Sequence, residues 1–355
     1  MLMNLIGALG SQGCHCVVGL FHNLPRPNTD LGDIARRQGI SVETIPCRRQ
    51  LDWSAVRAIR NCIEEHEADL IHTHGYKADI YGYISARLLR KPILATYHSS
   101  PDRTTRLRLY GTLDRVFLKR FDTVVAISSE RRRALQEFGV PSSRISMIWN
   151  GIDGSAFGNA VPARAGALGS VRGKVVGVVA RLVPEKGIQV LLRAASEVVR
   201  QYPDTLFLVV GSGPQRAELE ELAAQLGVSA NVRFLGQQHN MPAIYAAMDI
   251  VVLPSFDEGL PMCVLEAQAA SKAVIATAVG GTPDVIHHNE NGLLVQPRET
   301  AELRDAILRL LGDPAFCVQL GRNGEARIQA HFSSDAMASK YRVSYEAIVG
   351  QHQAA

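Results

Sequence analysis

The 355-residue sequence lacks features that mark several other classes of protein. No apolar run approaches the ~20 residues that a membrane-spanning helix needs, and the start, MLMNLIGALGSQG, has no positively charged flank of the kind found in signal peptides. The six cysteines have no zinc-type spacing, which favours reduced thiols in a cytoplasmic protein. The basic residues are not interleaved with stacking aromatics and the isoelectric point is about 8.8, so a nucleic-acid binder is disfavoured.

Size and charge predict a two-domain globular protein. The chain is longer than one typical domain, and its 46% hydrophobic and 20% charged residues are typical of a globular protein with an ample core. Residues 1–170 hold 22 Lys and Arg against 15 Asp and Glu, a net charge of +7, whereas the rest hold 16 against 19, a net charge of −3. The basic first half favours an anionic partner, such as a membrane surface or a phosphorylated acceptor.

Strand and helix patterns alternate along the first half. Strands separated by helical patterns imply βαβ units and a mostly parallel sheet, whose ligands bind beyond the carboxyl ends of the strands. Site residues are therefore expected at those strand ends. The predicted strands cover residues 41–45, 70–73, 93–97 and 123–127, and the predicted helices between them cover residues 53–65 and 79–89.

Three histidines, His72, His74 and His98, fall at the ends of predicted strands. Alternate histidines on a strand project from one face, which is one way to hold a metal ion. No carboxylate or cysteine completes a recognisable ligand set, so a zinc site is disfavoured. Hydrogen-bonded histidines at a domain edge, or histidines that contact a ligand, are the alternatives.

The second half contains two cations between a strand and a helix. The strand pattern ends at Arg181, and Lys186 follows before a helix that begins near residue 188. One Arg and one Lys match the charge of a diphosphate, the Arg as a two-pronged fork and the Lys as a point charge. Solvent-facing loop cations are the simpler alternative.

Residues 250–276, IVVLPSFDEGLPMCVLEAQAASKAVIA, hold two glutamates after a buried strand. Pro261 suits the first turn of a helix over the following residues, so the loop carrying Glu258 feeds a helix N-terminus, where a phosphate is favoured. Glu266 lies two turns into that helix. Taken alone, the two glutamates are equally well explained as exposed loop and helix acids.

The sequence of this stretch, EGLPMCVLEA followed by AVGGTPDVI and NGLLV, resembles the signature region of retaining glycosyltransferases of the GT-B fold, the large family 4 group. The other motifs occur in the expected order, and the resemblance covers nearly the whole chain. One departure is Asp284, where the family usually has Glu. The motifs are specific for the family and fold and not for the sugar.

The resemblance implies an α/β protein with two Rossmann-like domains facing across a cleft. Residues 1–160 form an acceptor-side domain that a C-terminal helix at 340–355 completes, residues 161–172 form a linker, and residues 173–339 bind the nucleotide-sugar. A sugar moves from a UDP- or GDP-linked donor to an acceptor hydroxyl, with no cofactor and no metal. The acceptor is a glycan or a lipid-linked molecule of cell-envelope or exopolysaccharide assembly.

The resemblance also assigns residues to roles. Catalysis falls to His98, Arg181, Lys186 and Glu258, and the acceptor side includes the His72 and His74 pair. Glu258 binds sugar hydroxyls, Glu266 the ribose hydroxyls, and the leaving phosphate takes the acceptor's proton. The donor-binding residues implied are Gly211, Gly213, Leu235, Gly236, Gly259, Leu260, Met262, Cys263 and Glu266.

The chain begins on a helical pattern at residues 2–10, whereas the family has a strand and a glycine-rich loop before this helix. That strand is central in a doubly wound sheet, so its loss is expected to leave a gap with unpaired backbone groups. Either the natural start lies upstream of Met1 or the first half is compromised.

The basic stretch at residues 103–133 mixes arginines with leucine, valine and phenylalanine. It predicts either an amphipathic helix on anionic lipid, which would make the protein peripheral on the inner face of the plasma membrane, or a core-packed helix with a solvated basic face. Two other functions stay open: a sugar-nucleotide epimerase of the same fold, and a non-catalytic nucleotide-sugar-binding subunit.

Overall fold

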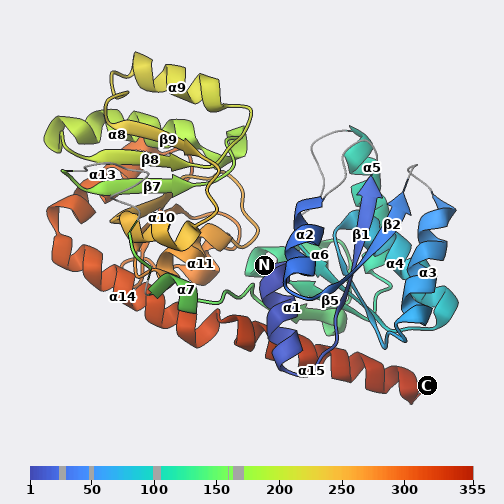
Figure 1. Cartoon of the computed structure of the whole chain (residues 1–355). Helices are drawn as coiled ribbons and strands as arrows, with labels where there is room; N and C mark the ends of the chain where they lie inside the picture. Colours follow the sequence, from blue (N-terminus) through green and yellow to red (C-terminus); the bar gives the residue numbers. More distant parts are fainter. Residues whose placement is uncertain (24–28, 48–51, 99–104, 159, 163–171, 355) are drawn as a thin grey trace. The chain divides into compact units, whose positions relative to one another are not determined.

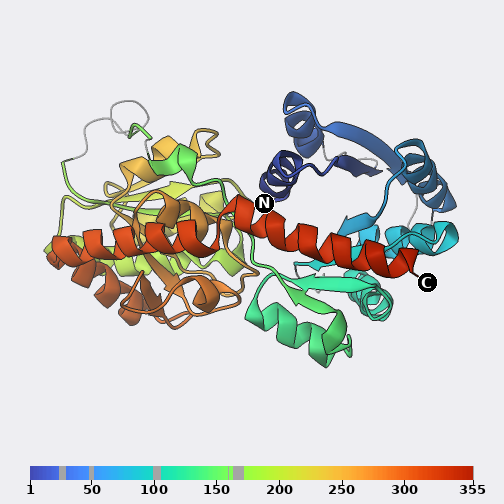
Figure 2. The same ribbon diagram turned by 90° about the horizontal axis from the view of Figure 1, so that it is seen from below.

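The computed structural model describes residues 1–355 except 24–28, 48–51, 99–104, 159, 163–171 and 355, and it leaves out the side chains of residues 23, 29, 30 and 105–110. Figures 1 and 2 show the chain from two directions. The chain divides into two compact units. Unit 1 comprises Met1–Trp149 with Ser334–Ala355, and unit 2 comprises Asn150–Ser333.

Unit 1 alternates strands and helices in the order that the apolar patterns predict. The helix at Trp53–Glu65 has the predicted bounds, and the Asp52 carboxylate caps it by accepting a hydrogen bond from the Ser54 N–H. The elements of unit 1 are α1 (Leu2–Ser11), β1 (Val17–Asn23), α2 (Thr29–Arg37), β2 (Ser41–Cys47), α3 (Trp53–Glu65), β3 (Ile71–His74), α4 (Tyr76–Leu89), β4 (Ile93–Tyr97), α5 (Thr105–Leu118), β5 (Thr123–Ala126), α6 (Ser129–Glu137), the 3₁₀ turn η1 (Ser142–Arg144), β6 (Ile145–Met147) and α15 (Ser334–Gln353).

The strands of unit 1 form two separate parallel sheets. β1 pairs with β2, and β3, β4, β5 and β6 form a second sheet in that order. Within the described residues, β1 and β3 each have a strand partner on one side alone, so each leaves one edge of backbone N–H and C=O groups outside any ladder. Figure 2 shows the two sheets as separate ribbons. The predicted gap in the first domain is thereby confirmed.

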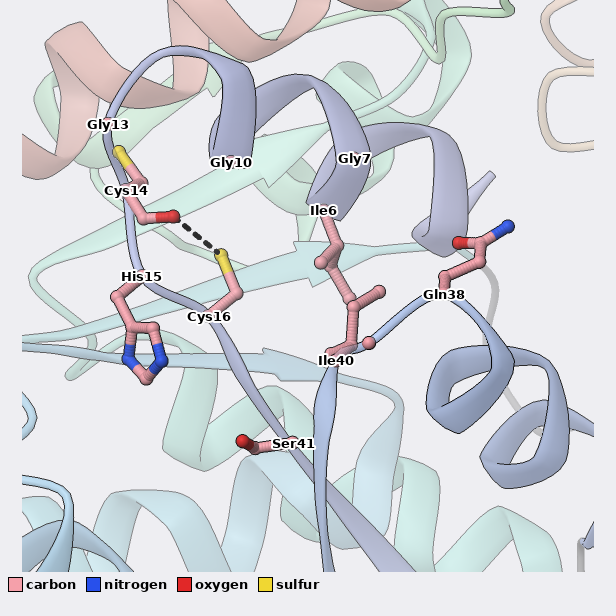
Figure 3. Close-up of a pocket in the computed structure, with 11 residues that line it drawn as sticks. Ile6, Gly7, Gly10, Gly13, Cys14, His15, Cys16, Gln38, Ile40 and Ser41 are labelled. Atoms are coloured by element: carbon pink, nitrogen blue, oxygen red, sulfur yellow. Dashed lines mark hydrogen bonds between the residues drawn. The ribbon is translucent and has the colours of Figure 1, made fainter.

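A hollow of about 510 Å³ lies between α1 and the segments that lead into β1 and β2 (Figure 3). Gly7, Gly10 and Gly13 line it, and a Cβ atom added to any of them would meet no atom within 4 Å. This face of α1 therefore lacks the close packing of an ordinary core helix. The lining includes none of the predicted site residues.

The C-terminal helix α15 belongs to unit 1, as predicted. Its residues Met337, Tyr341 and Ile348 are buried in one apolar cluster with Leu5 and Leu9 of α1 and with residues of β4 and β5. The chain thus leaves unit 1 at Trp149 and returns to it at Ser334.

Unit 2 has one six-stranded parallel sheet with the strand order β12-β11-β10-β7-β8-β9. Its central strands are continuous apolar runs that are buried on both faces, as is typical of parallel sheets covered by helices. The elements of unit 2 are α7 (Ser155–Gly158), β7 (Val175–Val179), the 3₁₀ turn η3 (Pro184–Lys186), α8 (Ile188–Gln201), β8 (Leu206–Val210), α9 (Arg216–Gln225), β9 (Val232–Gly236), α10 (Met241–Ala247), β10 (Ile250–Leu253), α11 (Met262–Ala269), β11 (Ala273–Thr277), α12 (Thr282–Val285), β12 (Leu293–Val295), α13 (Thr300–Gly312) and α14 (Pro314–His331).

The boundary between the units lies earlier in the chain than the linker predicted at residues 161–172. Residues 150–158 pack with unit 2, because α7 lies against α10 and α11 and the rings of Phe157 and Tyr245 are 6.0 Å apart. The second crossing lies at Ser333 and Ser334 rather than at residues 339 and 340. Most of the predicted linker, residues 163–171, lies outside the described residues.

Two buried carboxyl groups, Asp79 of α4 and Asp114 of α5, interact within unit 1. The Thr73 hydroxyl donates a 2.5 Å hydrogen bond to Asp79. Burial raises the pKa of both carboxyl groups, that of Asp79 well above its ordinary value and that of Asp114 to about 6. A carboxyl whose pKa is higher in the folded state makes folding less favourable as pH rises from the unfolded pKa to the folded one.

We expect Asp114→Asn to stabilise the protein at neutral pH, because it removes a carboxylate that must ionise while buried. The gain in free energy of unfolding over the natural protein should grow from pH 4 to pH 6 and reach about 1–3 kcal/mol above that. Urea unfolding of both proteins at pH 4, 5, 6 and 7 measures this. A difference that stays constant with pH would contradict the assignment.

Candidate active site

The predicted cations and glutamates of unit 2 meet at the carboxyl ends of two adjacent strands. β7 and β10 are neighbours in the sheet, with Ile250 opposite Val176. From this point β7, β8 and β9 proceed toward one edge, and β10, β11 and β12 toward the other. In open parallel sheets, such a switch in strand order is where the loops separate and ligands bind.

Lys186 and Glu258 form an ion pair at this switch point. The Lys186 Nζ lies 2.5 Å from the Glu258 Oε1, and the two side chains are only 19% and 9% exposed. Lys186 ends the turn η3 that follows β7, and Glu258 lies in the loop that follows β10. The pair places a half-buried cation beside a carboxylate that accepts hydrogen bonds, which suits a ligand with both phosphate and hydroxyl groups.

Backbone contacts fix the loops that carry this pair. The Phe256 N–H donates to the Glu185 carbonyl at 2.7 Å, and the Gly281 N–H donates to the Gly259 carbonyl at 2.8 Å. Gly187 has φ +62°, and a Cβ there would lie 2.0 Å from the Pro254 carbonyl oxygen. The loops after β7, β10 and β11 therefore hold one another, and the site is organised by backbone rather than by flexible side chains.

Arg181 is exposed just beyond the end of β7. Its backbone carbonyl accepts a hydrogen bond from the Val183 N–H at 3.0 Å, so the chain turns sharply after it. Its guanidinium makes no ion pair with the described residues. Arg181 and Lys186 thus lie on one loop, with the Lys held in the pair and the Arg facing solvent.

Glu266 is held by a residue that the motifs did not reveal. The hydroxyl of buried Tyr245 in α10 donates a 2.8 Å hydrogen bond to the Glu266 Oε2 in α11. Burial raises the pKa of the Glu266 carboxyl, and the tyrosine hydroxyl opposes that rise by stabilising the carboxylate. The available signal was a tyrosine in an apolar helix, since a buried tyrosine hydroxyl normally needs a partner.

The predicted glycines of the donor side have packing reasons in this fold. A Cβ on Gly211 would lie 1.9 Å from the Ala180 carbonyl oxygen, and one on Gly213 would lie 2.3 Å from the Leu182 carbonyl oxygen. Both glycines allow the chain after β8 to lie against the chain after β7. Leu235 and Gly236 end β9, and the Gly236 carbonyl accepts from the Gly211 N–H at 2.9 Å.

The remaining donor-side residues lie around the start of α11. Leu260 is buried, whereas Gly259, Met262 and Cys263 are half-buried. Burial raises the pKa of the Cys263 thiol, so this cysteine is a protonated packing residue at neutral pH. Pro261 stands immediately before the first residue of the helix.

In unit 1, His72 is part of a buried hydrogen-bond network. Its Nδ1 lies 2.7 Å from the Tyr345 hydroxyl and its Nε2 lies 2.7 Å from the Thr96 hydroxyl, which is in turn 2.8 Å from the Tyr341 hydroxyl. Both ring nitrogens thus contact residues of unit 1, and the network joins β3 and β4 to α15. His72 thus has a structural role in unit 1, and the acceptor-side role implied for it stays a prediction.

The His74 ring contacts both other histidines: its centroid is 4.3 Å from that of His72, and its Nδ1 lies 3.0 Å from the His98 Nε2. Burial lowers the pKa of His98 to about 4, that of His72 to about 3, and that of His74 well below its ordinary value. All three rings are neutral at pH 7, so they act as hydrogen-bonding groups rather than as cations. Within the described residues, no three His, Cys, Asp or Glu side chains are placed to share a metal ion.

Comparison with known proteins covers both halves of the chain. Residues 1–155 match the family described as Glycosyltransferase Family 4, and residues 167–327 match the family described as Glycosyl transferases group 1. The D-inositol 3-phosphate glycosyltransferase of Nocardia farcinica is 32% identical over 309 residues, which cover 81% of this chain and 68% of that protein. The 2-deoxystreptamine glucosyltransferase of Streptomyces kanamyceticus is 29% identical, covering 85% of this chain and 84% of that protein.

Solved structures give the same fold. The Anabaena protein HepE, in complex with UDP-glucose, superposes with a TM-score of 0.84 at 24% identity, covering 97% of this chain and 94% of that chain. The α/β fold predicted from the sequence is thereby confirmed.

We expect Tyr245→Phe to raise the pKa of Glu266, because it removes the O–H group that stabilises the carboxylate. Carbon-13 NMR titration of protein labelled at glutamate carboxyls measures this, with Glu266→Gln to assign the signal. The matched control is Phe157→Leu, which alters the packing on the tyrosine ring and keeps the hydroxyl. An unchanged or lower Glu266 pKa in Tyr245→Phe would contradict the role given to this hydrogen bond.

Proposed function

Because the chain belongs to glycosyltransferase family 4 and is a glycosyltransferase with the GT-B fold, we propose that it moves a sugar from a UDP- or GDP-linked donor to an acceptor hydroxyl, with retention at the anomeric carbon. The observation that carries this proposal is the pair of Lys186 and Glu258 at the switch point of the six-stranded sheet. A nucleotide-sugar offers the two groups that such a pair suits, a diphosphate and a ring of hydroxyls.

The cations serve the departure of the diphosphate. Cleavage of the bond between the sugar and the diphosphate places negative charge on the leaving oxygen, so groups that stabilise this charge bind the transition state more strongly than the ground state. Lys186 is half-buried, and this burial strengthens the attraction between its charge and the leaving oxygen. Its ammonium group has three N–H donors, so one can stay on Glu258 while another contacts that oxygen. Arg181 adds a second cation from the same loop, and we propose that no metal ion is needed.

The carboxylates and His98 position the rest of the donor. Glu258, fixed by Lys186, accepts hydrogen bonds from the sugar hydroxyls, and Glu266, fixed by Tyr245, accepts those of the ribose. His98 is neutral and meets sugar hydroxyls as a hydrogen-bonding group. The leaving phosphate takes the proton of the acceptor hydroxyl as the new bond forms on the face from which the diphosphate departs, so Glu258 is not a nucleophile.

The comparisons support a nucleotide-sugar donor and a hydroxyl-bearing acceptor, and they do not identify either molecule. HepE has been solved with UDP-glucose, and the two curated relatives are named for a cyclitol phosphate and an aminocyclitol. We propose a hydroxyl-rich acceptor, either a glycan or a lipid-linked molecule of cell-envelope or exopolysaccharide assembly. We also propose that residues 103–133 bind an anionic membrane surface on the cytoplasmic side. The net positive charge of residues 1–170 supports this. No helix in the described part of the chain is long and apolar enough to cross a bilayer.

The experiment that tests this function is isothermal titration of UDP- and GDP-sugars into the purified protein, followed by product analysis with candidate acceptors. We expect one donor to bind and its sugar to be transferred with the anomeric configuration kept, as proton NMR of the product shows. Interconversion of the donor sugar without transfer would support the epimerase instead. Binding without any turnover of the donor would support a non-catalytic subunit.

We expect Lys186→Ala to lower kcat by two or more orders of magnitude, which corresponds to about 2.7 kcal/mol or more of lost transition-state stabilisation. The matched control is Lys174→Ala, which removes an exposed lysine at the opposite end of β7 that pairs with Asp249 at 3.2 Å. Steady-state kinetics measure both, and circular dichroism checks that both fold. A normal rate in Lys186→Ala would remove the assignment of this residue to the diphosphate.

A further inference from the structure

A second surface of unit 1 combines exposed apolar side chains with arginines. A hollow of about 360 Å³ lies between α3 and the end of α4, and Trp53 and Leu88 at its rim are 74% and 57% exposed. Its lining residues are Trp53, Val56, Arg57, Arg60, Asn61 and Leu88. An exposed tryptophan beside an exposed leucine is unusual for a face in contact with water alone.

The position of Trp53 on α3 explains why it is not a core residue. α3 buries Ala55 and Val56 in one apolar cluster with Tyr81 of α4 and Ile45 of β2. Positions 53, 56, 57, 60 and 61 recur at helical spacing, so the hollow follows one stripe along α3. Ala55 and Val56 supply the contacts of α3 with this cluster, and Trp53 lies outside it.

The charges at the hollow are positive. Arg57 is exposed, and the buried Nε of Arg60 has no hydrogen-bond partner within the described residues. Another nitrogen of Arg60 lies 3.9 Å from the Glu64 carboxylate, and the Asp52 carboxylate beside Trp53 caps α3 through the Ser54 N–H. Arg90 and Lys91 lie two and three positions after Leu88 in the chain.

We infer that this Trp53 surface, consisting of Trp53, Arg57, Arg60 and Leu88, docks on an anionic phospholipid bilayer. Tryptophan is favoured at the boundary between headgroups and acyl chains, because its ring is apolar and its N–H is polar. Arginine binds lipid phosphates with its forked guanidinium, and each cation near an anionic surface adds to the affinity. A leucine beside them adds apolar area that enters the same boundary layer.

The next helix along the chain, α5, also exposes apolar side chains. α5 packs beside α4, as Figure 1 shows, and it exposes Leu113 and Val116. These two residues belong to the basic stretch at residues 103–133. The inference rests on the proposed membrane contact and extends that contact to residues outside this stretch. Vesicle binding is measured without a donor. A failure to bind vesicles is therefore distinguishable from a failure to transfer sugar.

The chain has two tryptophans, Trp53 and Trp149, which makes the surface directly observable. Trp149→Phe leaves Trp53 as the sole tryptophan reporter. On titration with vesicles containing 30% phosphatidylglycerol in phosphatidylcholine, its emission should shift to shorter wavelength, and brominated acyl chains should quench it. The shift should weaken as salt rises, and vesicles of phosphatidylcholine alone should leave the emission unchanged.

Two double variants test the residues by vesicle sedimentation. We expect Trp53→Ser with Leu88→Ser, and separately Arg57→Gln with Arg60→Gln, to lower the partition coefficient at least tenfold. The matched controls lie on unit 2: Val318→Ser removes an exposed valine and Arg193→Gln with Arg200→Gln removes two exposed cations, and neither should change binding. Circular dichroism checks that each variant folds.

Three results would overturn the inference. One is the absence of any shift or sedimentation with anionic vesicles. Another is vesicle binding that both surface variants leave intact, which would assign it to residues 103–133 alone. The third is a concentration-dependent dimer that Trp53→Ser with Leu88→Ser abolishes while vesicles bind unchanged, which would make a second copy of the chain the occupant.

Discussion

The donor side of this glycosyltransferase depends on one close approach between two backbone segments. Gly187 lies against the Pro254 carbonyl in a left-handed conformation, in a space too small for any Cβ atom. This contact holds the end of the turn after β7 against the loop after β10, and Lys186 and Glu258 are carried by those two segments. The ion pair is therefore set by backbone geometry, so binding a diphosphate would require little reorganisation of the loops.

The two units use their polar residues differently. In unit 2, Lys186 and Glu258 lie in the loops after β7 and β10 and pair with each other, whereas Glu266 in α11 is held by Tyr245, and all three are partly accessible. In unit 1, His72 is enclosed by hydroxyl groups of β4 and α15 and serves to join the C-terminal helix to the sheet. In unit 1 the strands form two separate sheets, and one face of α1 borders a hollow.

Much of the fold followed from sequence patterns, because buried parallel strands are short apolar runs and the helices between them have clear periodicity. The gap in the first sheet was also predictable, since the chain starts on a helix. The boundary at Asn150 was not, because residues 150–158 are held by contacts such as that of Phe157 with Tyr245, which composition does not reveal. The motifs located Lys186, Glu258 and Glu266 but gave no sign that Lys186 pairs with Glu258, that Tyr245 holds Glu266, or that both nitrogens of His72 are occupied. Each of these depends on residues far apart in the sequence.

A crystal structure of the protein with bound UDP is the most direct test of this donor site. We expect the diphosphate to contact Lys186 and Arg181 near the start of α11, the ribose hydroxyls to lie within hydrogen-bond distance of Glu266, and the contact between Gly187 and Pro254 to be kept. A diphosphate bound away from Lys186, or a site that forms only after these two loops separate, would contradict this expectation.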